Sequence, residues 1–378
     1  MKVLDKQARR DVLLGCAVLG CGGGGELDRG LRQVEDFEEK GVTLRLADLS
    51  EVPDNLLVAS PYYCGAVSPE GTRSLDPSAA GLEPVCQSEP AVAFQALEEA
   101  VGSRFYGVLS TELGGGNTAV AMAVAAERGL PLIDADPAGR SVPELIHSTL
   151  SLSGVSIAPF AVATRYGEVM VVRRVPNDIR AEALARSVAV LSGGRAGVCD
   201  HPVTGARLKT AVIPRAISHA ERIGRALREA REKGRDPVPA VAEEGCGAVI
   251  FEGVVREDSR WEDRNGVTEG DVFVDGRDQF HGRECRVNYR NEHMAAWLDG
   301  EIAVTVPDLI TLLERESGQP LLNPVIRKGT RLAVVVMPAP EAWRTPAGLR
   351  VLGPAYLGLG VKYTPVEVRF GRGKEGTR

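Results

Sequence analysis

The hydrophobic pattern of this chain is of two kinds, and it changes from one to the other near residue 165. Before that point, segments with apolar residues at helical spacing alternate with short apolar runs typical of buried strands. In chain order, the expected helices are 5–19, 88–101, 117–129 and 142–153, and the expected strands are 43–48, 56–60, 105–111 and 130–135. This alternation predicts an α/β domain over residues 1–165, with three layers and a mixed or mostly parallel sheet.

The second kind of pattern begins with the strand-like segment GEVMVVRRV (167–175) and amphipathic helical segments at 177–191 and 215–234. From residue 247 onward, short apolar runs follow one another, with Gly, Asp and Pro between them. Regularly spaced short strands of this kind are typical of an all-β architecture. We therefore predict a β-rich C-terminal domain over residues 166–378, with two helices near its start.

Composition and charge narrow the class of protein. The 378 residues are 44% apolar and 25% charged, as in ordinary globular proteins. A net charge of −6 without a basic stripe argues against a nucleic-acid partner. The seven cysteines are scattered without a CxxC pair, and no run reaches the roughly 20 apolar residues that span a bilayer. Asp5 and Asp11 interrupt a lipoprotein-like start, so we expect a cytoplasmic protein without a membrane partner.

Candidate chemistry gathers between residues 111 and 144, where predicted strands end and helices begin. Glu112 follows a strand, and Gly114, Gly115, Gly116 and Asn117 lead into a helix. Open α/β sheets bind ligands at such edges. We interpret Glu112 as a general base beside a pocket formed by the glycine turn and the Asn117 amide. The alternative for Asn117 is a helix N-cap, which is compatible with that role.

A second group of polar residues follows the next strand. Asp134 and Asp136 have the spacing of a strand-end D-x-D pair, which holds a divalent metal or orients a base, unless one of them caps the next helix. Arg140 and Glu144 begin the expected helix 142–153, with His147 one turn on. Arg140 is expected to bind a substrate carboxylate or to pair with one of the acids.

The run from Gly20 to Gly25 satisfies G-x-G-x-x-G and precedes a helical segment. Three interpretations stay open: a dinucleotide loop, a loop whose Gly22, Gly23, Gly24 and Gly25 amides face a ligand, or a structural turn. A helix precedes the run and no ribose-binding acid follows, so neither nicotinamide nor flavin is expected. Cys21 is either a nucleophile, its pKa lowered by a helix dipole, or a small residue in a crowded turn.

The histidines carry a weaker signal. His281, Cys285 and His293 have a loose zinc-like spacing, but the segment has a strand pattern. The metal question stays open, with a divalent ion at the aspartates as one answer.

Seven blocks of the chain resemble the S-methyl-thiohydantoin desulfurase domain family. They are LGCGGGG (19–25), TELGGGN (111–117), LPLIDADPAGRSVPEL (130–145), HPVTGA (201–206), YRNEHMAA (289–296), VPDLITLLERESGQPL (306–321) and APEAWRTPAGLRVLGPAYLGLGVKYTPVE (339–367). The resemblance implies an α/β N-terminal domain, a β-rich C-terminal domain and hydrolytic removal of sulfur from a methylated thiohydantoin ring. It also implies association with hydantoinase-type proteins.

Two blocks depart from the usual wording of that family. The family typically has D-G-M-G-R-A-F-P-E-L where this chain has DPAGRSVPEL (136–145), and YYCGAVSPEG (61–70) lacks a Gly-Ala-Pro run. A changed substrate is the consequence if these segments line the pocket.

The resulting hypothesis is a hydrolase acting on a small cyclic amide or imidate. Water activated by Glu112 or by a metal at Asp134 and Asp136 would attack the ring, and Cys21 would do so in a covalent variant. The alternative is a non-catalytic ligand-binding or accessory subunit with a hydantoinase-type partner, and a nucleotide-binding enzyme comes third. The many glycine turns and the tightly packed second domain favour a homo-oligomer.

Overall fold

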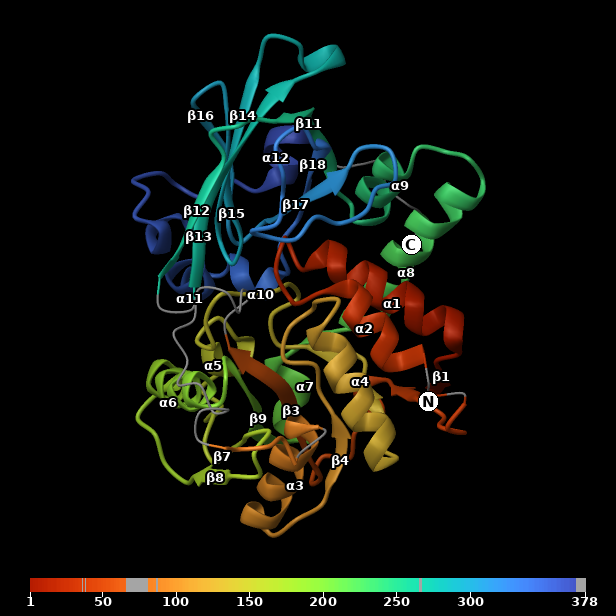
Figure 1. Cartoon of the computed structure of the whole chain (residues 1–378), viewed down its shortest axis with the longest axis vertical. Helices are drawn as coiled ribbons and strands as arrows, with labels where there is room; N and C mark the ends of the chain where they lie inside the picture. Colours follow the sequence, from red (N-terminus) through yellow and green to blue (C-terminus); the bar gives the residue numbers. More distant parts are fainter. Residues whose placement is uncertain (36, 38, 66–80, 86–87, 265–266, 372–378) are drawn as a thin grey trace.

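The computed structural model describes residues 1–35, 37, 39–65, 81–85, 88–264 and 267–371. Two large β-sheets dominate these residues, and Figure 1 shows them at opposite ends of the molecule. The second block that departs from the family wording, 61–70, is described only as far as residue 65. No helix in these ranges combines the length and the apolar character that a membrane crossing requires.

The first sheet has eight strands in the order β1-β2-β5-β4-β3-β9-β7-β8. Its strands are β1 (Lys2–Val3), β2 (Arg45–Ala47), β3 (Leu57–Gly65), β4 (Phe105–Val108), β5 (Leu132–Ile133), β7 (Phe160–Ala163), β8 (Val169–Val172) and β9 (Arg195–Thr204). The four strands β2, β5, β4 and β3 run parallel, and the others pair antiparallel. The predicted mixed sheet is confirmed.

Helices cover both faces of this sheet, as alternation along β7 demonstrates. Ala161 and Ala163 join a core with α3 and α4, whereas Phe160 and Val162 face the opposite way into a core with α6. Three layers result. The longer helices of this half are α1 (Lys6–Leu19), α2 (Leu27–Glu35), α3 (Glu89–Val101), α4 (Asn117–Arg128) and α6 (Asp178–Leu191). Gly129, at φ 66°, ends α4 in a left-handed C-cap.

The second sheet is antiparallel, with the order β16-β15-β14-β13-β11-β18-β17, and β12 pairs with β13. Its strands are β11 (Ala248–Val255), β12 (Arg260–Arg264), β13 (Val267–Gly276), β14 (Glu284–Arg290), β15 (Glu292–Leu298), β16 (Glu301–Thr305), β17 (Leu309–Glu314) and β18 (Arg331–Met337). Cys285, Val287 and Tyr289 of β14 are buried while their neighbours are partly exposed, which is the period-two pattern of a sheet with one buried face. The predicted β-rich C-terminal part is confirmed.

Helix α8 (Ala216–Glu232) joins the two halves by packing along α1. Their crossing is unusually close, because a Cβ added to Gly15 would lie 1.8 Å from the Ala220 carbonyl oxygen. On the other helix, a Cβ added to Gly224 would lie 1.9 Å from the Asp11 carbonyl oxygen. Helix α9 (Pro237–Glu244) follows α8 and packs on β11 and β18. This chain of contacts fixes the second sheet against the first domain (Figure 1).

The remaining elements are short. They are β6 (Ala135–Asp136) paired with β10 (Ile213–Pro214), the helices α5 (Thr149–Leu152), α7 (Gly205–Ala211), α10 (Glu341–Arg344), α11 (Pro346–Val351) and α12 (Val366–Phe370), and 3₁₀ turns at Leu49–Glu51, Asp278–Phe280 and Pro354–Leu357. Strands β8 and β9 belong to the first sheet although they follow residue 165. The domain boundary predicted near that residue stays a prediction.

The expected helix over 142–153 is wrong, since only Thr149–Leu152 is helical. Thr149 N–H, which such a helix would pair with the Leu145 carbonyl, donates instead to the Pro137 carbonyl at 2.6 Å. Val142 N–H donates to Glu112, and Leu145 N–H donates to Glu182. Pro143 between them has no N–H to donate. Arg140, Glu144 and His147 therefore lie on an irregular segment and not on one helix.

Candidate functional site

The two glycine-rich segments dock against each other after the carboxyl end of β4. The Gly24 carbonyl accepts hydrogen bonds from the N–H groups of Gly116 and Asn117, both at 3.0 Å, at the start of α4. A Cβ added to Gly24 would lie 2.5 Å from the Gly114 Cα, so this approach requires glycine. The amides at the start of α4 thus bind the protein's own backbone, and the two runs shape the site by close packing.

Glu112 lies where the sequence predicted, in the segment after β4. Its Oε1 accepts from Asn117 Nδ2 at 2.5 Å, and its Oε2 accepts from Val142 N–H at 2.7 Å. Asn117 is the first residue of α4 and its side chain makes no capping bond, so the N-cap alternative is wrong. Burial raises the pKa of Glu112 to about 7, although the Val142 N–H, Ser141 and Asn117 all favour the charged form.

Glu292, at the start of β15, brings a second carboxyl group to the same place. It is 2% exposed, and its Oε1 accepts from Ser141 Oγ at 3.2 Å. Its Oε2 has no hydrogen-bond partner among the described residues. Burial, together with the charge of Glu112, raises the pKa of Glu292 well above its usual range. Near neutral pH, the two carboxyl groups therefore hold at least one proton between them.

The backbone of the first glycine run faces Glu292 directly. A Cβ added to Gly23 would lie 2.0 Å from Glu292 Oε1, so a side chain there would displace the carboxyl group. A Cβ added to Gly24 would lie 3.2 Å from Ser141 Oγ. Within the described ranges, the N–H groups of Gly24 and Gly25 have no acceptor. These two backbone donors thus lie beside residues that bind the carboxyl groups, Gly24 next to Ser141 and Gly25 next to Asn117.

His293 and Asn323 complete the site from the second half of the chain. His293 N–H donates to the Cys21 carbonyl at 2.7 Å, and Asn323 N–H donates to the Gly22 carbonyl at 2.9 Å. Burial lowers the pKa of His293 to about 4, so its ring is neutral. Its Nδ1 lies 3.0 Å from the Ile310 carbonyl and carries the proton, which leaves Nε2 as an acceptor without a hydrogen-bond partner among the described residues.

Cys21 is fully buried in the glycine turn at φ 50°. Its Sγ donates to the Leu19 carbonyl at 3.2 Å. Burial raises the pKa of this thiol, even though the charge of Arg140 opposes the rise. The expectation that a helix dipole lowers its pKa is therefore wrong.

Asp134 and Asp136 point to different partners. Asp134 accepts from the Ser218 N–H at 2.9 Å and from its hydroxyl at 2.5 Å, and so holds the start of α8. Asp136 accepts from the N–H groups of Ala138 and Gly139 in a turn, and burial raises its pKa to about 8. In the described part of the chain, no three His, Cys, Asp or Glu side chains are arranged to hold a metal ion.

Arg140 is fully buried and spans the two halves of the molecule. Its Nε donates to the Ser141 carbonyl, its Nη1 to the Asp308 and Pro307 carbonyls, and its Nη2 to the His293 carbonyl at 2.9 Å. Every nitrogen of the guanidinium is thus used by the protein itself. Binding of a substrate carboxylate, as expected from the sequence, has no support in this geometry.

Glu144 belongs to a neighbouring, partly exposed cluster. Its Oε1 accepts from the Tyr356 hydroxyl at 3.2 Å, and Arg290 Nη1 donates to the same hydroxyl at 2.9 Å. His147 packs edge-on against the Tyr356 ring with centroids 4.8 Å apart, and burial lowers its pKa to about 3.

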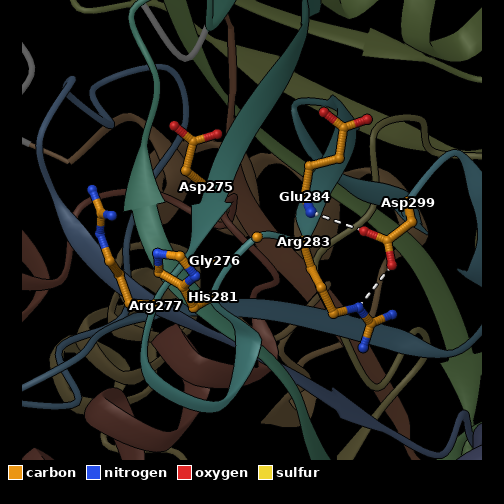
Figure 2. Close-up of a pocket in the computed structure, with 8 residues that line it drawn as sticks. Asp275, Gly276, Arg277, His281, Arg283, Glu284 and Asp299 are labelled. Atoms are coloured by element: carbon orange, nitrogen blue, oxygen red, sulfur yellow. Dashed lines mark hydrogen bonds and ion pairs between the residues drawn. The ribbon is translucent and has the colours of Figure 1, made fainter.

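A separate open pocket of about 480 Å³ lies on the second sheet (Figure 2). It is lined by Asp275, Gly276, Arg277, His281, Gly282, Arg283, Glu284 and Asp299. Arg283 Nε donates to Asp299 at 2.7 Å, a contact that Figure 2 shows, so these two charges of the lining neutralise each other. His281 is exposed there, whereas Cys285 and His293 are buried elsewhere, so the zinc-like spacing does not form one site.

Sequence reasoning found one side of the site and missed the other. Glu112, Asn117 and the glycines were found because one short segment carries them all. Ser141, Glu292, His293 and Asn323 were missed as site residues. The only signal for two of them was the polar Asn-Glu-His interruption at 291–293 between apolar stretches, inside a block that resembles the family.

The fold and the site define a two-domain protein, with one mixed α/β half and one antiparallel half, whose halves meet around the carboxyl groups of Glu112 and Glu292. Residues 7–174 match the S-Me-THD-like N-terminal domain, and residues 176–366 match the S-Me-THD-like C-terminal domain. The chain therefore belongs to the S-Me-THD-like family, as its sequence blocks predicted.

One solved structure extends this comparison. The crystal structure of a protein from Chromobacterium violaceum superposes with a TM-score of 0.77, at 24% sequence identity, over 97% of this chain and 100% of that chain. At this identity the likeness shows a shared fold. No curated protein matches the chain.

Proposed function

We propose that this protein is a hydrolase that acts on a small cyclic amide or imidate such as an S-methyl thiohydantoin. The products would be methanethiol and a hydantoin. The carboxyl pair Glu112 and Glu292 carries the proposal, because one pKa is raised to about 7 and the other well above its usual range. Such a pair supplies a base and an acid together near neutral pH. Membership of the S-Me-THD-like family supports this substrate class.

Glu112 is assigned as the base, because the hydrogen bonds from Asn117 and the Val142 N–H favour its charged form and its side chain keeps some exposure. It takes one proton from a water molecule whose oxygen bonds to the ring carbon that carries the methylthio group. Glu292 protonates the ring nitrogen, which receives the electron pair of the C=N bond. The C–S bond then breaks as the carbonyl forms. The hydroxyl proton returns to Glu292, and the proton on Glu112 passes to sulfur.

Two further groups are assigned roles in this reaction. The free N–H groups of Gly24 and Gly25 would stabilise negative charge that develops at the reacting centre. Cys21 would remain a thiol, because burial raises its pKa. Water is therefore favoured over the covalent route as the nucleophile.

The test is product formation from an S-methylated thiohydantoin, with methanethiol and hydantoin measured by mass spectrometry. Glu112→Gln and Glu292→Gln are expected to lower kcat/KM by about 10²–10⁴-fold, the usual contribution of a general acid or base. Cys21→Ser should keep activity within about tenfold. Glu221→Gln is the matched control, since Glu221 is also buried, at 3% exposed, but lies on α8 and pairs with Lys2 and Arg225.

Two results would overturn the proposal. Full activity in both Glu112→Gln and Glu292→Gln would remove the carboxyl pair from the mechanism. Tight binding of the thiohydantoin without turnover would support the accessory-subunit alternative instead, in which a hydantoinase-type partner performs the chemistry.

A further inference from the structure

Strand β8 ends the first sheet and presents an apolar free edge. It pairs with β7 on one side, and the described residues provide no strand on the other. Val169, Met170 and Val171 are 45%, 38% and 36% exposed, which is unusual for three consecutive apolar residues of a strand. In Figure 1, β8 lies at the lower margin of the molecule, away from the second sheet. An apolar edge that has no strand partner among the described residues is a template for pairing with another strand.

The hydrogen-bonding pattern of the β7–β8 hairpin determines which backbone groups of β8 point away from β7. Thr164 N–H donates to the Glu168 carbonyl, so the backbone of Glu168 faces β7. Along an antiparallel strand, successive residues direct their backbone N–H and C=O groups alternately toward one side of the strand and the other. The backbone N–H and C=O groups of Val169, Val171 and Arg173 consequently point away from β7, toward the free edge.

We propose that a second copy of this chain pairs with β8 in antiparallel orientation, about a two-fold axis through Val171. This register places two outward-facing residues opposite each other at every hydrogen-bonded position, as the ladder requires. Val171 then lies opposite its own copy, Met170 opposite Val172, and Glu168 opposite Arg174. The two eight-stranded sheets become one continuous sheet.

Charge complementarity at the ends of the strand supports a second copy as the occupant. Glu168 lies at one end of the apolar run, and Arg173 and Arg174 lie at the other, all exposed or partly exposed. Neither arginine has an ion-pair partner within the described ranges, while Glu168 accepts only a hydrogen bond from Thr164. The two-fold axis creates the Glu168–Arg174 contact twice, once at each end.

The test is the mass of the full chain in solution, measured by light scattering during size-exclusion chromatography at micromolar concentration. The wild-type chain is expected to be a dimer. Glu168→Arg and Arg174→Glu should each weaken the dimer by about tenfold or more, since each change sets like charges opposite each other. An equimolar mixture of the two variants should restore the wild-type mass. In the mixed dimer, one end of the interface has the native charge pair and the other end has the same pair with its charges exchanged.

Two controls test the register itself. Val171→Pro removes an outward N–H without breaking the bonds to β7, so it should yield a folded monomer with unchanged circular dichroism. Arg350→Glu, at an exposed position of α11, should leave the mass of the dimer unchanged. A monomeric wild type would overturn the inference, as would a dimer that survives Val171→Pro or a mixture that fails to reassociate. Hydrolytic activity is measured separately, so failure here leaves the proposed function untouched.

Discussion

Glu112 and Glu292 come from opposite halves of the chain, and the charge of Glu112 helps to raise the pKa of Glu292. The sequence revealed only the first of them, because Glu112 is followed within five residues by its own partner, Asn117. Glu292 has no spacing relation to Glu112 in the sequence. Only the tertiary fold, which sets Ser141 beside both carboxyl groups, makes them a pair.

The raised pKa of Glu112 predicts how the stability of the folded protein changes with pH. Its pKa is about 7 in the folded state against an ordinary 4.5, so the folded state binds more protons between these values. Stability contributed by this group is present below about pH 4.5 and is lost as pH rises through 7. Glu112→Gln removes that loss. Its Tm, relative to wild type, should therefore rise by about 2–4 °C between pH 5 and pH 8.

Thermal unfolding in matched buffers checks this prediction, with Glu221→Gln as the control that must show no such rise. A Tm difference for Glu112→Gln that stays constant with pH would mean that the carboxyl group is not protonated in the folded protein.

Gly23 makes a second prediction at this scale. A Cβ there would lie 2.0 Å from Glu292 Oε1, so Gly23→Ala must displace the carboxyl group. Displacement of an acid by about 1 Å lowers activity by about 100-fold. Gly360→Ala is the matched control, because no atom lies within 4 Å of a Cβ built at that position. Equal kcat/KM in the two variants would show that the position of Glu292 does not matter.

Periodicity predicted most elements correctly, because the segments concerned obtain their stability from one buried face. The alternation that separates Phe160 and Val162 from Ala161 and Ala163 is local and readable. The helix predicted over residues 142–153 is absent for the opposite reason. There, the Thr149 N–H that the helix would need donates to the Pro137 carbonyl, and Glu112 and Glu182 bind the N–H groups of Val142 and Leu145. No local pattern reports such competition.

The crossing of α1 and α8 supports a prediction at the scale of elements. Gly15→Ala would set a Cβ 1.8 Å from the Ala220 carbonyl oxygen, so the two helices must separate. Overpacking of this kind costs about 1–3 kcal/mol of unfolding free energy. Urea unfolding measures it. Arg222→Ala, which removes an exposed ion pair with Glu244 from α8, should cost less than about 1 kcal/mol. Equal losses would contradict the close crossing.

The whole molecule depends on contacts between its two halves, and Arg140 is central among them. Four carbonyl groups, three of them in the second half, accept its hydrogen bonds. Its charge also lowers the pKa of Glu292. Arg140→Met should therefore destabilise the fold by about 3 kcal/mol or more, and raise the pKa of Glu292 further. Urea unfolding tests the first effect. A shift of the alkaline limb of the pH–rate profile to higher pH tests the second.

The hydrophobic pattern of the sequence alone predicted the two-sheet architecture, but it did not predict how the two halves join. The hydrogen bonds from His293 to Cys21 and from Asn323 to Gly22 are backbone contacts, which side-chain patterns do not encode. The family blocks contain both glycine runs and the Asn-Glu-His segment. They thus mark the interface of the two halves without describing its geometry.

The acid–base pair is tested most directly by the pH dependence of kcat/KM for methanethiol release. This profile is compared between wild type and Glu292→Gln. A bell-shaped profile is expected for wild type, with an acid limb near pH 7 as Glu112 ionises and an alkaline limb as Glu292 loses its proton. Glu292→Gln should lose the alkaline limb and about 10²-fold or more of the rate. A wild-type profile without an alkaline limb, or one unchanged in Glu292→Gln, would contradict an acid–base pair at the interface of the two halves.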